Sequence, residues 1–155
     1  MGFLVWLEAS GLAEWVRMST PGYPTMITAH AIGMAIMVGL ALVLDLRLLG
    51  WFGGIPLQAL HRLLKIAWIG FGINFLSGAA LFAAQATSYI VDVVFMSKLF
   101  LVLLGAVTAA MLQPAIATAD SWSGTRTPSN VRTLAILSII FWLGAIVTGR
   151  LTAYL

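Results

Sequence analysis

A histidine within a stripe of methionines is the part of this chain best suited to bind a metal or a metal-containing cofactor. Met26, His30, Met34 and Met37 fall at i, i+4, i+8 and i+11, which places them on one face of a helix. Imidazole binds iron, copper and zinc, and thioether sulfur binds Cu(I). The stripe therefore predicts either haem b held by His30, or a copper site formed by His30, Met26 and Met34. A packing role stays open, because Met fills gaps in apolar cores.

His61 is the second histidine, and it lies beside Arg62 and Lys65 near the start of another apolar segment. Antiparallel helices would separate it from His30 by roughly 20 Å in depth, judged from the rise per residue. The two histidines therefore cannot ligate one iron. A haem would need His30 with a methionine, such as Met34 or Met37, or with one open position. We expect His61 to face acidic lipid headgroups.

Lys98 and Arg150 are cations expected on the same side of the membrane as His30. They would bind the carboxylates of a haem, or else extend to lipid headgroups. Asp45 and Arg47 flank the end of the first apolar segment. They are two residues apart and do not share a helix face, so we expect each to pair with another element.

Gly70, Asn74 and Gly78 share one face of a second apolar segment. Small residues let helices approach closely, and an amide can form a hydrogen bond across the contact. This face predicts a helix-packing seam joined by Asn74. The alternative is that Asn74 is a polar point on a binding or conduction path.

These residues lie on long apolar segments, in a chain of 155 residues of which only 8% are charged. Soluble domains carry about 25% charged residues. Each segment is about 20 residues or longer, enough to cross a hydrocarbon core of roughly 30 Å. We predict an all-α fold: an integral membrane four-helix bundle forming a single domain over residues 1–155. The expected spans are 25–49, 60–84, 98–118 and 131–151, with a polar connection at 120–130.

Residues 2–18 have a different pattern, in which apolar residues recur at helical spacing among Glu8, Glu14 and Arg17. This pattern predicts a short amphipathic helix lying in the membrane interface. The alternative is a partly ordered leader. The Pro21–Pro24 segment should then turn the chain into the membrane.

The distribution of basic residues predicts the orientation. Five lie near the connections at one end of the spans and three near the other end. This bias favours an orientation with both termini outside the cytoplasm, which means the periplasm if the host is a Gram-negative bacterium. The expected partners are the lipid bilayer and other membrane subunits or a second copy of the chain. With so few charges, the net charge of +3 does not indicate a nucleic-acid partner.

Four short segments carry a resemblance to known membrane proteins. The segments 27–33 (ITAHAIG) and 44–50 (LDLRLLG), together with 71–82 (FGINFLSGAALF) and 95–98 (FMSK), resemble a family of small four-helix proteobacterial inner-membrane proteins whose domain has no assigned function. More distantly, the early histidine is similar to one in the membrane domain of copper-resistance D proteins. The first resemblance implies fold and location but no activity.

The sequence leaves three functions open. The first is a non-catalytic subunit of a membrane redox or electron-transfer assembly that binds haem b through His30. The second is a copper-handling or small-solute transport protein, and the third a purely structural or assembly subunit. Walker, Gly-x-Ser-x-Gly and HExxH motifs are absent, and so are cysteines. An enzyme is therefore the less favoured reading.

Overall fold

Every regular element that the structure describes is a helix. The computed structural model describes residues 2–118, 127–152 and 154, so most of the polar connection expected at 120–130 lies outside the described residues. The helices are α1 (Gly2–Glu8), α2 (Gly11–Met18), α3 (Gly22–Leu48), α4 (Leu57–Ala84), α5 (Ala86–Tyr89), α6 (Val93–Ala117) and α7 (Ser129–Leu151). Four of them, α3, α4, α6 and α7, are long and apolar enough to cross a membrane. The predicted all-α, multi-pass membrane fold is confirmed.

The predicted spans end within one residue of the observed helices, but each observed helix begins two to five residues earlier. Pro24 lies in the first turn of α3, where a missing N–H leaves no hydrogen bond unmade. Helix α3 therefore begins at Gly22, within the Pro21–Pro24 segment, and not after it as predicted. At α6, the Asp92 carboxylate caps the helix by accepting hydrogen bonds from the N–H groups of Val94 and Phe95.

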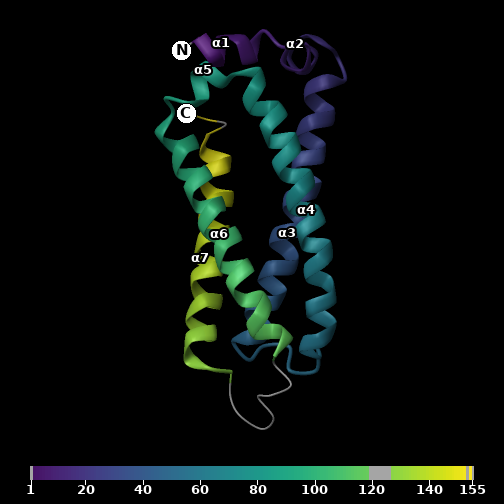
Figure 1. Cartoon of the computed structure of the whole chain (residues 1–155), viewed down its shortest axis with the longest axis vertical. Coiled ribbons are helices and arrows are strands. Elements are labelled where there is room, and N and C mark those ends of the chain that lie inside the picture. The colour runs from purple at the N-terminus through teal and green to yellow at the C-terminus, as the bar shows by residue number, and fades with distance from the viewer. Residues whose placement is uncertain (1, 119–126, 153, 155) are drawn as a thin grey trace.

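The single surface helix predicted for residues 2–18 is in fact two helices. The Ser10 hydroxyl accepts a hydrogen bond from the N–H of Ala13 at 3.3 Å and so begins a new helix, α2. Both short helices lie across one end of the bundle (Figure 1). Val16 is buried against Ala80 and Ala84 of α4. Phe3 and Trp6 of α1 and Trp15 of α2 are exposed, which fits helices that lie in a membrane interface.

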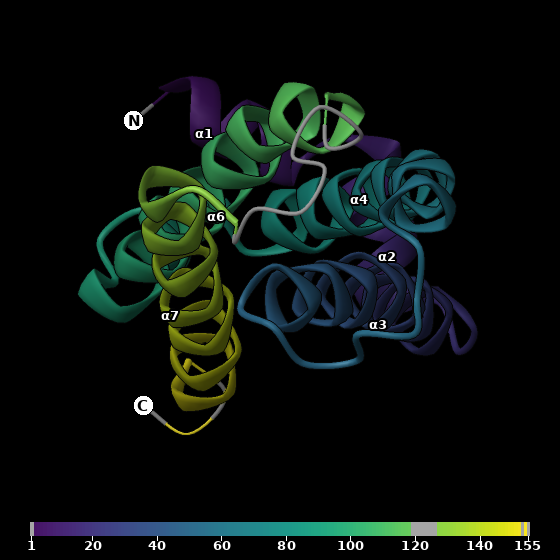
Figure 2. The same cartoon turned by 90° about the horizontal axis from the view of Figure 1, so that it is seen from below.

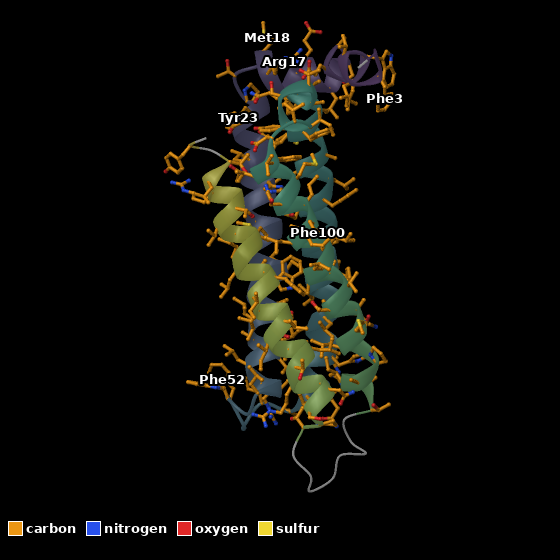
Figure 3. The ribbon with its side chains drawn as sticks, turned by 90° about the vertical axis from the view of Figure 1, so that its left-hand side faces the viewer. Phe3, Arg17, Met18, Tyr23, Phe52 and Phe100 are labelled. Carbon is orange, nitrogen blue, oxygen red and sulfur yellow. The ribbon has the colours of Figure 1, made fainter. Side chains whose placement is uncertain are left out.

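The long helices form two antiparallel hairpins. α3 packs along α4, and α6 packs along α7, whereas contacts between the hairpins are fewer and run mainly from α3 to α7. Figures 1 and 2 show the two pairs side by side, with both chain ends at the same end of the bundle. Apolar side chains cover the outside, such as Phe100 on the flank of α6, between Phe3 and Phe52 at the two ends (Figure 3).

The contact between α3 and α4 is backbone against backbone. A Cβ atom added to Gly33 would lie 2.5 Å from the Asn74 nitrogen and 2.6 Å from the Gly70 carbonyl oxygen. A Cβ added to Gly70 would lie 2.7 Å from a methyl carbon of Ile36. Both positions therefore need glycine because the helices leave no space for a side chain.

We expect Gly33→Ala to destabilise the bundle, because its methyl group would push against the α4 backbone. Overpacking of this kind costs about 1–3 kcal/mol. Gly39→Ala is the matched control on the same helix, since nothing lies within 4 Å of its Cβ position. It should be neutral or slightly stabilising, by about 0.5–1 kcal/mol from helix propensity. Unfolding in detergent, followed by circular dichroism, measures both. Equal stability of the two variants would contradict the close contact.

Candidate functional site

His30 and Asn74 hold α3 and α4 together by two reciprocal hydrogen bonds. His30 Nδ1 lies 2.9 Å from the backbone carbonyl oxygen of Asn74, and the side-chain nitrogen Nδ2 of Asn74 donates to the backbone carbonyl oxygen of His30 at 2.8 Å. A carbonyl oxygen can only accept, so Nδ1 carries the ring proton. The other ring nitrogen, Nε2, is then unprotonated and has its lone pair free.

Two small residues of α4 complete the surroundings of the imidazole. A Cβ atom on Gly78 would lie 3.0 Å from His30 Cε1, so glycine makes room for the ring. The Ser77 hydroxyl lies 3.4 Å from Nδ1 and donates to the Ile73 carbonyl at 2.6 Å. The predicted seam residues Gly70, Asn74 and Gly78 thus all face α3. Because α3 begins at Gly22, His30 lies about 12 Å along the helix, judged from the helical rise. A helix starting at residue 25, as predicted, would have placed His30 closer to its beginning.

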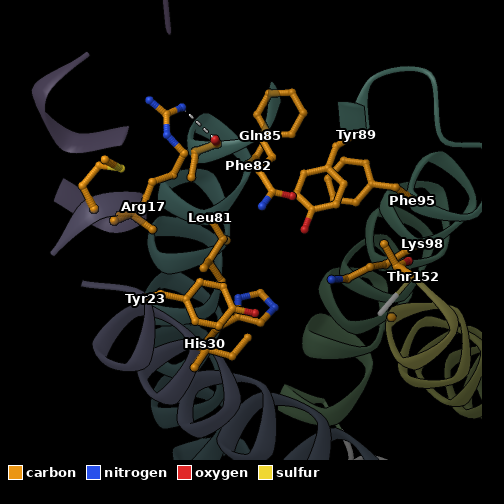
Figure 4. Close-up of a pocket in the computed structure, with 16 residues that line it drawn as sticks. Arg17, Tyr23, His30, Leu81, Phe82, Gln85, Tyr89, Phe95, Lys98 and Thr152 are labelled. Carbon is orange, nitrogen blue, oxygen red and sulfur yellow. Dashed lines mark hydrogen bonds between the residues drawn. The ribbon is translucent and has the colours of Figure 1, made fainter. Parts of the chain in front are cut away.

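His30 lines a cavity of about 760 Å³ at the end of the bundle where both termini lie. This volume is within the range of small-molecule and cofactor sites, about 300–1,000 Å³. The walls come from both hairpins and from α2 and α5. In Figure 4, Lys98 of α6 reaches into the space from the side opposite His30, and the Gln85 and Tyr89 side chains point into it from above.

Two cations line this cavity, Arg17 and Lys98, and Lys98 is the one on the side opposite His30. Its alkyl chain lies against the bare backbone of Gly149, with Cε 3.3 Å from the position of a Cβ there. Its ammonium lies 5.9 Å from the centre of the Phe95 ring. Among the described residues it makes no hydrogen bond or ion pair. Arg150, expected to act with Lys98, is instead exposed outside the cavity and donates to the Tyr154 hydroxyl at 2.7 Å.

An aromatic stack forms one wall of the cavity. Phe95 lies between Phe82 and Tyr89, with ring centres 5.6 Å and 4.8 Å away. Burial, with smaller effects of Tyr23 and Asp92, raises the pKa of Tyr89 above its ordinary value. The Tyr89 hydroxyl therefore stays protonated at neutral pH and can donate a hydrogen bond into the cavity.

The short helices close the cavity from above. The Arg17 guanidinium donates to the Ala84 carbonyl at 3.0 Å and to the Glu8 carbonyl at 2.9 Å. Glu8 Oε1 accepts from the N–H and the hydroxyl of Thr87, each at 2.8 Å. These hydrogen bonds from Thr87 lower the pKa of Glu8. Arg17 and Glu8 thus attach α1 and α2 to α4 and α5.

The methionine stripe is divided between different surroundings. Met34 and Met37 line a separate void of about 20 Å³ next to His30, space for roughly one water molecule. Met26 packs elsewhere, against the apolar cluster of Val16, Ala80 and Ala84. The described residues contain no group of three or more His, Asp or Glu side chains able to hold a metal ion. His61 lies near the start of α4, at the other end of the bundle.

Sequence reasoning missed several residues of the cavity. Gln85 and Tyr89 lie between the predicted spans 60–84 and 98–118, where the chain forms the short helix α5 directly after Gln85. Arg17 was assigned to the polar face of a surface helix, although its guanidinium reaches α4. The available signal was local: polar and aromatic side chains cluster next to predicted helix ends on the His30 side.

The fold and the cavity define the class: a multi-pass helical membrane protein with a histidine-lined cavity at the terminal end of its bundle. Comparison of the chain with family models, with curated proteins and with solved structures finds no match. Any function must therefore be argued from the residues of the site.

We expect Glu8→Ala to release Thr87, since the carboxylate accepts both of that residue's hydrogen bonds. Hydrogen exchange at the Thr87 amide should show lost protection, while Glu14→Ala, which removes an exposed carboxylate, should leave it unchanged. Because the pKa of Glu8 is lowered in the folded protein, its stabilising effect is complete above the ordinary value of 4.5. In the unmodified protein, protection should therefore be lost only as the pH falls through that lowered pKa. Full protection in Glu8→Ala would contradict this role.

Proposed function

We propose that this chain is a non-catalytic integral membrane subunit that holds haem b in the cavity, with His30 Nε2 as an axial ligand. The hydrogen bond from His30 Nδ1 to the Asn74 carbonyl carries this proposal. Metal-ligating histidines almost always donate their other ring N–H to a carbonyl, a carboxylate or water, which fixes the ring and leaves the second nitrogen for the metal. Here that second nitrogen belongs to a residue lining a large cavity.

The other residues of the cavity suit a flat, apolar group with acidic substituents. The stack of Phe82, Phe95 and Tyr89 offers an aromatic surface. The ammonium of Lys98, which has no acidic partner among the described residues, would bind a propionate. Met34 and Met37 line the small void rather than the cavity, so the proposal leaves the second axial position open.

Bound haem would supply one-electron redox chemistry, which places the chain in a membrane redox or electron-transfer assembly. The residues of the chain would bind the group, fix its orientation and separate it from water. The location proposed is the bacterial inner membrane with periplasmic termini, supported by the basic residues at the opposite end. The cavity would then face the periplasmic side.

A structural or assembly role is the second candidate, because the reciprocal bonds of His30 and Asn74 also hold two helices together. On this reading the imidazole is interhelical glue and needs no ligand. The copper alternative has less support, since Met26 lies in a different cluster from Met34.

An optical spectrum of the purified protein separates the two candidates. Haem binding should give a Soret band that His30→Ala abolishes. Lys98→Gln should keep the axial ligand but release haem more readily, because a propionate loses its cation. Arg150→Gln is the matched control and should retain haem as the unmodified protein does, since Arg150 lies outside the cavity. A stable, colourless protein that takes up no added haem would favour the structural role instead.

Reporter fusions test the proposed orientation. Alkaline phosphatase is active only outside the cytoplasm, so a fusion after Leu155 should be active and a fusion within the 120–130 connection inactive. The reverse pattern would place the cavity on the cytoplasmic side. It would leave the haem proposal standing, because the orientation rests on the basic residues alone.

A further inference from the structure

A second group of polar side chains lies in the core of the bundle, between α3 and α7. Asp45 of α3 and Ser138 of α7 are each 1% exposed, and Trp142 of α7 is 3% exposed. Both Asp45 carboxyl oxygens, the Ser138 hydroxyl and the Trp142 Nε1 have no hydrogen-bond partner. The Ser138 hydroxyl lies near the Asp45 carboxyl, but the geometry between the two groups is not that of a hydrogen bond. Asp45 had been expected to pair with another element, and here it does not.

Apart from Ser138, the core around this part of α3 is apolar. Leu44 and Leu48 of the same helix pack with Leu60 and Leu64 of α4 and with Leu112 of α6. On α7 the core residue of this cluster is Ala135, and Trp142 belongs to the next apolar cluster along the bundle. The Trp142 indole is held in place by contact with the bare backbone of Gly105 on α6.

No charged group among the described residues pairs with this carboxyl. Arg47 turns away and donates to the Ile55 carbonyl at 2.7 Å. On α4, Arg62 and Lys65 are exposed and His61 is partly exposed, and on α7 Arg132 is exposed. On α6 the buried polar side chain in this region is the uncharged Thr108, whose hydroxyl donates to the backbone carbonyls of Leu104 and Gly105.

The Asp45 carboxyl is buried with no cation beside it, and this determines whether it is ionised. An ionised carboxylate that is buried without a partner costs at least several kcal/mol, and such a group binds a proton instead. A neutral Asp45 has one O–H to donate, which Ser138 can accept.

The same atoms are unsuited to a metal ion. Hard cations take six or more oxygen ligands, or keep most of their water. The Asp45 site offers only one carboxyl and one hydroxyl among the described residues. A proton needs only the carboxyl itself and suitable neighbours.

We propose that Asp45, with Ser138, forms a buried proton-binding site at the end of the bundle opposite the His30 cavity. The carboxylic acid releases its proton to water and becomes a carboxylate, which the Ser138 hydroxyl then stabilises as a donor. The reverse step restores the acid. The site belongs to the contact between the two hairpins, so proton uptake and release act on that contact.

Infrared difference spectroscopy of the full chain in lipid nanodiscs tests the proposal when the pH is raised from about 6, where exposed carboxyl groups are already ionised. The unmodified protein should lose the C=O band of one protonated carboxyl per chain and gain carboxylate bands. Asp45→Asn should lack this change, and Glu14→Gln, which alters an exposed carboxylate, should retain it. Identical spectra for the unmodified protein and Asp45→Asn, at every pH where both are helical, would overturn the proposal.

A second variant keeps the test decisive if Asp45→Asn fails to fold. Ser138→Ala leaves the carboxyl in place but removes its hydrogen-bonding neighbour. The C=O band should shift in frequency, and the titration should move to higher pH because the carboxylate loses a donor. An unshifted band together with an unchanged titration would contradict the assigned site.

Discussion

The reciprocal hydrogen bonds between His30 and Asn74 are the interaction on which the rest of the structure depends. Hydrocarbon offers no water to satisfy a buried amide or imidazole, so each must find a partner in the protein. They reach each other only because Gly33 and Gly70 let the two backbones touch. The same bonds orient the imidazole. Helix packing and the chemistry of the cavity are therefore parts of one contact, and neither can change without the other.

Helix α3 connects two polar sites of different kinds. Near its start, His30 is hydrogen-bonded through Nδ1 to α4, the other helix of its hairpin. Near its end, Asp45 faces α7, which belongs to the other hairpin, and has no partner. The first site rests on a firm contact within a hairpin, and the second on the weaker contact between hairpins. Movement of one hairpin against the other would thus disturb Asp45 before it disturbs His30.

The sequence predicted the elements well but not how they face each other. Four apolar segments were enough to define the spans, and the amide of Asn74 was expected to bond across a helix contact. Its partner could also have been found: His30 lies 18 residues before the end of α3, and Asn74 lies 17 residues after the start of α4. In an antiparallel hairpin, two residues that lie the same number of positions from the connection are at about the same depth in the bundle.

The position of Asp45 and the shape of the cavity could not be predicted in the same way. In a soluble helix the apolar face shows which side is buried. Here α3, α6 and α7 are apolar on every face, because both the lipid and the protein core favour apolar side chains. The hydrophobic pattern of α3 therefore does not show which of its faces, the one with Asp45, packs against Ser138. The cavity depends on α5 and on the spacing of the hairpins, and it has no local signal beyond Gln85 and Tyr89.

The division into two hairpins also determines the order in which the protein can be assembled. The chain emerges from the ribosome with α3 and α4 first, and their contact needs nothing from the later helices. The cavity is different, because His30 comes from the first hairpin and Lys98 from the second. It exists only after α6 and α7 have inserted and docked. Whatever group occupies it must therefore be loaded last, after insertion, from the side of the membrane where the two termini lie.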